Sequence, residues 1–205
     1  MIKLSNTSKM NVKGKRVRSW SLEAGVTCPM SKDVEVCKSC YALKGMYRFP
    51  VVKAVRQHNR DDYKTPDFVE RMVAACSKLD MVRLFDSGDC ETKELALKLE
   101  EVITKTPNIS WWFPTRMDKS ASVNSVLSRI ALLPNVALRP SADNIGLDKP
   151  ERAGVNSYVI RQSDIPMAIA KGINICPVTL PGSTQKSCNT CTTCYTNEKV
   201  AYVIH

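Results

Sequence analysis

Residues 81–89 read Met-Val-Arg-Leu-Phe-Asp-Ser-Gly-Asp, and they set the architecture of the chain. The first six form a short β-like run that ends in Ser87, Gly88 and Asp89. From about Thr92 the apolar spacing becomes that of an amphipathic helix, with Leu95, Leu99, Val102 and Ile103 at positions i, i+4, i+7 and i+8. A strand followed by such a helix is half of a βαβ unit, so the stretch predicts a parallel sheet.

The same alternation continues on both sides of this stretch. We predict strands at 16–22, 81–86, 109–113, 135–139, 156–161, 172–175 and 199–204, and helices at 41–63, 66–79, from 92, from 120 and at 166–171. Strands that alternate with helices predict an α/β fold, which we treat as one domain over residues 1–205. The pattern alone leaves open whether the parallel strands form an open doubly wound sheet or a partial barrel.

Charge and composition narrow the class of protein. The chain carries 30 Lys and Arg against 20 Asp and Glu, a formal net charge of +10, which favours anionic partners. Such a partner is a small-molecule or nucleotide-like anionic ligand, with nucleic acid as a further candidate. Residues 1–10 lack the apolar core of a signal peptide, and no apolar run reaches the roughly 18 residues of a membrane span. We therefore expect a cytoplasmic protein with no membrane partner; the sequence leaves its oligomeric state open.

Seven of the nine cysteines fall into two groups. Cys28, Cys37 and Cys40 have the spacing C-x8-C-x2-C; the second group is Cys176, Cys188, Cys191 and Cys194, spaced C-x11-C-x2-C-x2-C within a cysteine-rich segment, 176–198. In a reducing compartment clustered cysteines indicate metal more often than disulfides, so we interpret 176–198 as a metal-binding segment within the domain.

The spacing favours iron–sulfur ligation over zinc. Soft thiolates suit both, but three cysteines at C-x2-C-x2-C are more typical of a 4Fe–4S cluster than of a zinc knuckle. Zinc is the lesser alternative, and catalytic or incidental thiols are a third. Either each group holds its own cluster, or both groups converge on one. The remaining cysteines are interpreted as core residues, because Cys76 belongs to the apolar stripe of a helix and packing is the favoured role of Cys90.

Polar residues collect where the predicted strands end. Because the carboxyl ends of parallel strands line the ligand site of α/β proteins, we take eight residues as candidate ligand-binding positions. They are Ser87, Gly88, Asp89, Thr115, Arg116, Arg139, Ser141 and Arg161. Cys28 and Cys176 each follow a predicted strand as well, so both cysteine groups are expected at this same edge.

Three motifs carry a resemblance to a known family. The chain contains C-P-x7-C-x2-C-Y-A from Cys28, then V-R-L-F-D-S-G-D from Val82, then a strand that ends in P-T-R at Arg116. In these motifs it resembles the phage "gene product 88" family and, more distantly, the radical S-adenosylmethionine-like phage proteins whose cysteine loop ends in C-Y-A. The resemblance implies a phage origin, and hence the host cytoplasm, and a radical-SAM-like partial (β/α) barrel of about six parallel strands with cysteine-rich loops at its C-terminal edge.

The comparison with radical S-adenosylmethionine enzymes also implies roles for residues. Their three-cysteine loop follows the first strand, as Cys28, Cys37 and Cys40 do here, and a glycine-rich acidic motif after the second strand binds the methionine amine. Ser87-Gly88-Asp89 stands in that place. The resemblance makes S-adenosylmethionine a candidate cofactor, although the first cysteine gap is eight residues here against three in the usual loop.

Two functional hypotheses follow. The first is an iron–sulfur redox or radical-SAM-like enzyme, in which the cofactor performs the difficult chemistry and the protein positions it. The alternative is a basic nucleic-acid-binding protein with structural or redox-sensing metal clusters, which would use the basic and aromatic residues of 41–63.

Overall fold

The computed structural model describes residues 1–6 and 10–204. In this part of the chain seven strands form one open sheet in which every neighbouring pair is parallel. The strands are β1 (Val17–Trp20), β2 (Met81–Leu84), β3 (Ser110–Thr115), β4 (Val136–Ile145), β5 (Ser157–Ile160), β6 (Asn174–Ile175) and β7 (Val200–Val203). The predicted α/β class with a parallel sheet is therefore confirmed, with seven strands where about six were expected.

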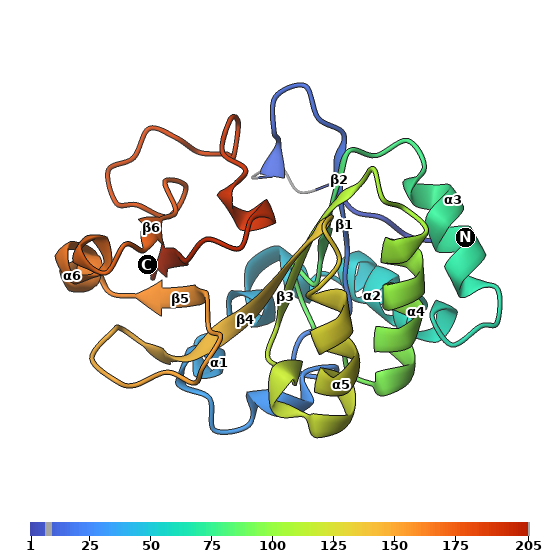
Figure 1. The fold of residues 1–205 in the computed structure, drawn as a ribbon, viewed down its shortest axis with the longest axis horizontal. Coiled ribbons are helices and arrows are strands. Elements are labelled where there is room, and N and C mark those ends of the chain that lie inside the picture. Colours follow the sequence, from blue (N-terminus) through green and yellow to red (C-terminus); the bar gives the residue numbers. More distant parts are fainter. Residues whose placement is uncertain (7–9, 205) are drawn as a thin grey trace.

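The strand order is β1-β2-β3-β4-β5-β7-β6, so the first five strands follow one another in sequence. Crossovers that all run in one direction place their helices on one face of the sheet, because parallel connections share one hand. Figure 1 shows α4 (Lys93–Thr104) and α5 (Ala121–Ile130) side by side on that face, with α3 (Phe68–Cys76) next to α4. The sequential order and one-sided helical layer are consistent with a partial barrel, whereas a doubly wound sheet carries helices on both faces.

Alternation along the strands separates the helical face from the other face. The main hydrophobic cluster joins Val82 and Leu84 of β2 and Trp111 and Phe113 of β3 to the helices. Leu95, Leu99, Val102 and Ile103 supply the predicted stripe of α4, and all four are buried. The residues between them in the strands, Arg83 and Trp112, point to the opposite face, because successive side chains alternate. We call this second face the inner face.

Irregular segments cover the inner face in place of helices. The connection from β6 to β7, residues 176–199, contains one short 3-10 turn, Thr193–Tyr195, which packs against β3 and β4. This segment meets the N-terminal arm, since Val12 and Asn189 form an isolated parallel bridge. A smaller hydrophobic cluster, with Ile160, Ala168, Ile173, Ala201 and Val203 at its centre, supports β5–β7 and α6 (Ile165–Ala170).

Two local expectations differ from the structure. The helix expected over 41–63 begins only at α2 (Pro50–Asp62), because proline fits the first helical position and disfavours helix in the residue before it. Residues 41–48 instead form two 3-10 turns, and a short α1 (Glu35–Lys38) precedes them. Thr92 caps α4 by accepting a hydrogen bond from Leu95 N at 3.1 Å, whereas the expected cap Ser120 makes no such bond. Among the described residues no helix is long and apolar enough to cross a membrane.

Candidate functional site

The first cysteine group lies in the loop after β1, at the carboxyl end of β2. Cys37 lies in α1, and Cys40 N donates to Cys37 O at 3.2 Å, so one turn of chain brings these two thiols together. Cys28 interacts electrostatically with both of them and with Asp89. All three side chains are partly buried. The structure therefore gathers this group at the expected edge.

Burial and nearby cations act in opposite directions on these thiols. Burial raises the pKa of Cys28 to about 12 and also raises the pKa of Cys37, while the positive charges of Arg116 and Lys119 partly lower the latter. Metal ligation needs thiolates, so binding here would release protons. The same two cations can offset the negative charge of the thiolates when a metal is bound.

Groups of the protein itself fill most of the hydrogen-bond acceptor positions of the Asp89 carboxylate. Its Oδ1 accepts hydrogen bonds from Cys90 N at 2.8 Å and Thr115 Oγ1 at 2.7 Å, and its Oδ2 accepts one from Arg116 N at 2.9 Å. Burial nevertheless raises the pKa of Asp89, against these hydrogen bonds. A carboxylate has about four acceptor positions, so one remains, on Oδ2. Asp89 thus ties the end of β2 to the end of β3.

Ser87 and Gly88 also join parts of the chain. Ser87 Oγ donates to Leu22 O at 2.7 Å and accepts from Arg56 Nε at 3.0 Å. Gly88 has φ +75°, and a Cβ there would lie 2.5 Å from Thr27 Oγ1 and 2.8 Å from the backbone of Leu22. The close approach that the glycine permits is made by the loop after β1.

The remaining candidate positions fall into two kinds. Arg139 is fully buried, and it donates to Ser157 Oγ and to the carbonyl oxygens of Asn156, Thr196 and Glu198. Ser141 O accepts from Arg152 Nη2 at 2.8 Å. Arg161 is exposed, and its guanidinium lies 3.7 Å from Asp148 and 3.8 Å from Glu35. Arg139 therefore holds the end of the cysteine-rich segment to the sheet, and Arg116 interacts electrostatically with Cys37.

The second cysteine group lies against the inner face. Cys176 directly follows β6, with its N donating to Ala201 O at 2.8 Å. Cys194 Sγ lies 3.2 Å from the hydroxyl oxygen of Tyr202 on β7. Cys188 interacts electrostatically with Cys176, Cys191 and Cys194, so the four thiols share one neighbourhood. Burial raises the pKa of Cys188 to about 11.

Three buried polar atoms beside this group have no hydrogen-bond partner among the described residues. They are Arg83 Nε, Trp112 Nε1 and Tyr195 Oη. The Arg83 guanidinium lies 4.2 Å from the centre of the Trp112 ring, which in turn lies 5.9 Å from the Tyr195 ring. Tyr195 and Arg83 both interact electrostatically with Cys188. Buried polar groups almost always find partners, so these three atoms keep a hydrogen-bonding capacity that the described residues do not use.

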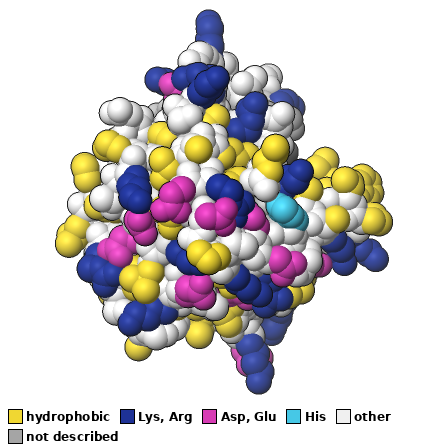
Figure 2. Space-filling model, turned by 90° about the vertical axis from the view of Figure 1, so that its right-hand side faces the viewer, with side chains coloured by type: hydrophobic (Ala, Val, Ile, Leu, Met, Phe, Trp, Pro, Cys, Tyr) yellow, Lys and Arg dark blue, Asp and Glu magenta, His cyan; other side chains and the backbone are white. Residues whose placement is uncertain are grey.

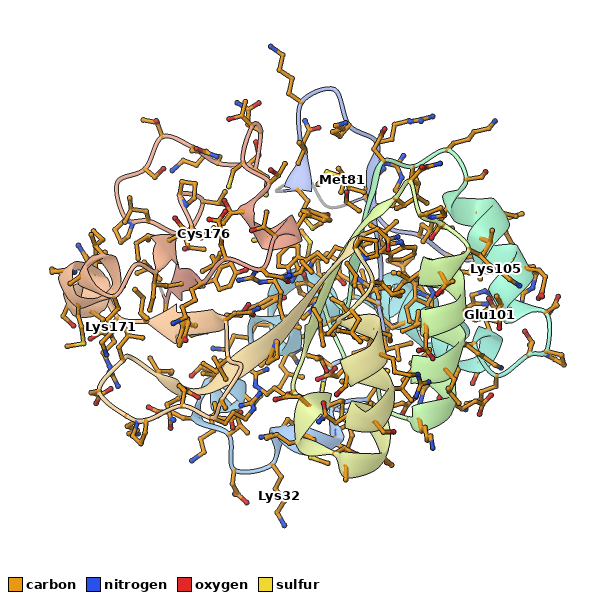
Figure 3. The ribbon with its side chains drawn as sticks, in the orientation of Figure 1. Lys32, Met81, Glu101, Lys105, Lys171 and Cys176 are labelled. Atoms are coloured by element: carbon orange, nitrogen blue, oxygen red, sulfur yellow. The ribbon has the colours of Figure 1, made fainter. Side chains whose placement is uncertain are left out.

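Each group has its own electrostatic neighbours: Cys28 interacts with Cys37 and Cys40, and Cys188 interacts with Cys176, Cys191 and Cys194. In Figure 3 the labelled Cys176 lies beside β6, and Lys32, in the loop that carries the first group, lies at the bottom of the view. The cations near the first group are Arg116 and Lys119, and those near the second are Arg83 and Arg139. Cys28 and Cys176 each follow a strand at its carboxyl end, as expected, whereas the turn that carries Cys194 packs against β3 and β4 on the inner face.

In neither group do the described thiols converge as the ligands of a single metal ion would. Within residues 1–6 and 10–204, no three His, Cys, Asp or Glu side chains converge closely enough to hold one metal ion. Thiolates on a cluster bind different iron atoms, so they need not converge as the ligands of one ion must. The donor set of both groups, thiols with flanking cations or free donors, fits such a cluster.

The two other cysteines are core residues, as expected. Cys76 and Cys90 are fully buried in the main hydrophobic cluster. Burial raises the pKa of Cys76 to about 12 and that of Cys90 well above its ordinary value, so neither is a reactive thiolate.

Sequence reasoning missed the inner-face residues Arg83, Trp112 and Tyr202. A signal was present, because Arg83 stands between Val82 and Leu84 in a buried strand, and a charge there must face something other than the core. No single-sequence pattern pairs Arg83 with cysteines that lie about a hundred positions away.

Comparison with known proteins bears on the whole chain. No curated protein and no solved structure matches it. A family model described as gene product 88 matches residues 2–199, which is nearly the full length and includes both cysteine groups. The chain therefore belongs to the gene product 88 family.

Proposed function

We propose that this chain is an iron–sulfur protein with two separate cluster sites, one for each cysteine group. The observation that carries the proposal is the set of three unpartnered donors, Arg83 Nε, Trp112 Nε1 and Tyr195 Oη, beside the second group. Cluster sulfurs accept hydrogen bonds from such donors, and those bonds help to set the reduction potential. An empty apolar core would give no reason to bury three donors together.

The ligand sets differ between the two sites. The first supplies Cys28, Cys37 and Cys40, and a four-iron cluster bound by three thiolates keeps one iron open to another ligand. The second supplies four cysteines and can close its cluster fully. Zinc is the alternative at the second site, because four thiolates also make a structural zinc site.

The proposed activity is redox or radical-SAM-like chemistry at the first site. An iron–sulfur cluster supplies one-electron transfer when bound. The chain's own part is to hold a ligand beside the open position, with Arg116 and Lys119 offsetting negative charge there. S-adenosylmethionine is the candidate ligand, and its amine has one acceptor position on Asp89 Oδ2 to use.

Metal analysis on anaerobically purified protein tests the proposal. We expect iron and sulfide in the wild type, and loss of about half the iron in Cys40→Ala and in Cys191→Ala. Cys76→Ala is the matched control, since that thiol lies in the core outside both groups, and it should keep all the iron. Colourless protein with stoichiometric zinc would refute the iron–sulfur assignment, and loss of all iron in either group variant would refute two separate sites.

A second candidate function is nucleic-acid binding by residues 41–51. Tyr41 and Phe49 are 56 % and 58 % exposed beside the exposed cations Lys44 and Arg48, an arrangement suited to base stacking and phosphate contact. The rest of the expected basic stretch is committed elsewhere, for example Arg60 to Glu91 at 2.8 Å. Figure 2 likewise shows cations and carboxylates interspersed on the side of α3 and α4.

Salt dependence separates this function from the first. Affinity for single-stranded oligonucleotides that falls steeply with salt, and falls again in Phe49→Ala, would support it. Absent or salt-insensitive binding would exclude it.

A further inference from the structure

A polar cavity opens beside the first cysteine group. It encloses about 530 Å³, within the usual range for small-molecule sites. The loop 32–38 lines one side, and the other side comes from Lys119 after β3, Asp143 and Asn144 at the end of β4, and Lys149 just beyond it. The cavity therefore stands at the carboxyl ends of β3 and β4, where α/β proteins hold their ligands.

Its lining is dominated by lysines rather than by the apolar side chains of an ordinary pocket. Four lysines face three carboxylates, and the lining residues are Lys32, Asp33, Val34, Glu35, Lys38, Lys119, Asp143, Asn144 and Lys149. The Glu35 carboxylate already lies 2.8 Å from Lys149, and the Asp143 carboxylate lies 2.9 Å from Arg152 and 3.2 Å from Lys119. Two of the three wall carboxylates are thus paired within the protein.

Two lysines remain uncommitted. Lys32 and Lys38 are exposed and take part in no ion pair among the described residues, and Asp33 is the one wall carboxylate in the same condition. Two ammonium groups against one carboxylate leave a positive excess on this side of the cavity. Arg116, which lies 3.6 Å from Asp143, and Arg161, which lies 3.8 Å from Glu35, add positive charge behind the wall.

We propose that this cavity binds the phosphate groups of a small molecule, such as a nucleoside triphosphate, next to the first cysteine group. Lysine ammonium groups act as point charges for phosphate oxygens, and the two uncommitted lysines, Lys32 and Lys38, suit a ligand with two or more negative charges. Lys38 directly follows Cys37, so the same turn that carries that thiol also carries one wall of the cavity.

Isothermal titration of the as-isolated full chain with pyrophosphate, ATP and adenosine tests the site. We expect pyrophosphate and ATP to bind with an affinity that falls as salt rises, and adenosine not to bind. The double variant Lys32→Ala/Lys38→Ala should weaken the binding of both phosphate ligands by roughly tenfold or more, because it removes both uncommitted positive charges from a partly solvated site.

The control is Lys171→Ala, an exposed lysine at the far left of Figure 3 that lies away from Lys32. It should leave both affinities unchanged. Absence of pyrophosphate and ATP binding, adenosine binding as tight as ATP, or an equal effect of the control would each overturn the proposal. Iron is measured on the same samples, so that this test stays distinct from the iron–sulfur proposal. Absence of phosphate binding in iron-loaded protein would overturn only the cavity proposal. Phosphate binding in protein that contains zinc instead of iron would overturn only the iron–sulfur proposal.

Discussion

At the scale of single residues, Arg56 and Asp86 form a buried ion pair, so loss of either side chain should strongly lower the free energy of unfolding. Arg56 Nη2 lies 3.0 Å from Asp86 Oδ1, and the two side chains are only 6 % and 5 % exposed. Arg56 also donates to Ser87 Oγ, so it joins α2 to the turn after β2. A buried pair adds little over an apolar pair, but removal of one partner leaves the other charge buried and uncompensated.

Arg56→Ala should therefore lower the free energy of unfolding by about 3–5 kcal/mol. The matched control is Arg16→Ala, whose pair with Asp80 at 3.3 Å lies at the surface and should contribute about 1 kcal/mol or less. Urea unfolding followed by circular dichroism measures both. Equal losses in the two variants would show that burial of the Arg56 pair has no special role.

The raised pKa of the buried Cys76 thiol should make the stability of the protein depend on pH. Its ordinary thiol pKa of 9.0 applies to the unfolded chain, and burial raises the folded pKa to about 12. The folded protein keeps the proton longer, so this group has no effect below pH 9 and removes stability as the pH rises from 9 to 12. At pH 10 the wild type should lose about 1.4 kcal/mol through this thiol.

The destabilisation caused by Cys76→Ala should accordingly be smaller at pH 10 than at pH 7.5 by about that amount. Urea unfolding at the two pH values gives the difference directly. A destabilisation that is independent of pH would mean that the buried thiol does not hold its proton.

Sequence alone predicted the role of a residue correctly where that role depends on burial. It was incomplete where the role depends on hydrogen-bond partners from distant parts of the chain. The apolar stripe around Cys76 was enough to predict a core thiol. Arg139 was expected at a ligand, but it bonds to carbonyl oxygens of residues 196 and 198, and no local pattern indicates a partner so distant. Hydrogen-bond partners that arise from tertiary packing are not encoded in spacing.

For the turn after β2, tight packing is the governing feature. Gly88 combines a left-handed φ of +75° with contact to Thr27 and Leu22, so both the backbone and the neighbours exclude a side chain. Through this contact the loop that carries Cys28 is fixed to the end of the strand that carries Arg83. The turn thereby positions the first cysteine group.

Gly88→Ala should cost about 2–4 kcal/mol, because the strain of a positive φ adds to overpacking against the loop. Gly154→Ala is the control: it has φ +82° with nothing within 4 Å, so only the backbone strain of about 1–2 kcal/mol remains. Thermal or urea unfolding compares them. A cost for Gly88→Ala no larger than for Gly154→Ala would contradict the packing argument.

Helices and strands with strong periodicity were predictable, and their boundaries depended on a few residues. The apolar stripe of α4 and its start near Thr92 follow from local sequence alone. The helix expected over 41–63 begins only at Pro50, because proline fits the first helical position and disfavours helix in the residue before it. Periodicity reports a buried face, and it does not by itself report where hydrogen bonding begins.

Across the fold as a unit, the cysteine-rich segment takes the place of a helical layer on the inner face. It has little regular structure of its own, and hydrogen bonds such as those from Arg139 to Thr196 O and Glu198 O and from Lys13 N to Asn189 O hold it to the rest of the chain. Bound metal stabilises whatever conformation binds it.

Removal of metal with a chelator should therefore make residues 176–199 much more susceptible to trypsin while the β1–β4 core stays resistant. Mass spectrometry of early fragments would locate the first cuts, with Lys186 and Lys199 as the expected sites. Cys191→Ala should show the same cuts without chelator, and Cys76→Ala should not. First cuts in the core, or equal rates with and without metal, would contradict a role of metal in ordering the segment.

The α/β class followed from the sequence, but the order of the last three strands in the sheet did not. Alternating elements predicted a parallel sheet, and the first five strands do lie in chain order. The insertion of β7 between β5 and β6 depends on the pairing of Ser157 and Asn174 with Val200, contacts that only the folded chain brings together.

The contact between the N-terminal arm and the cysteine-rich segment orders events during synthesis. Lys13 N donates to Asn189 O at 2.7 Å, so the arm acquires this partner only after nearly the whole chain has left the ribosome. Strands β1–β4 and their helices need only local crossovers and can assemble earlier. Until residue 195 emerges, the nascent chain presents the surface around Trp112 without the Tyr195 ring that packs against it. A stalled or truncated polypeptide would keep that surface open to aggregation and to chaperones, even though most of its sheet is already built.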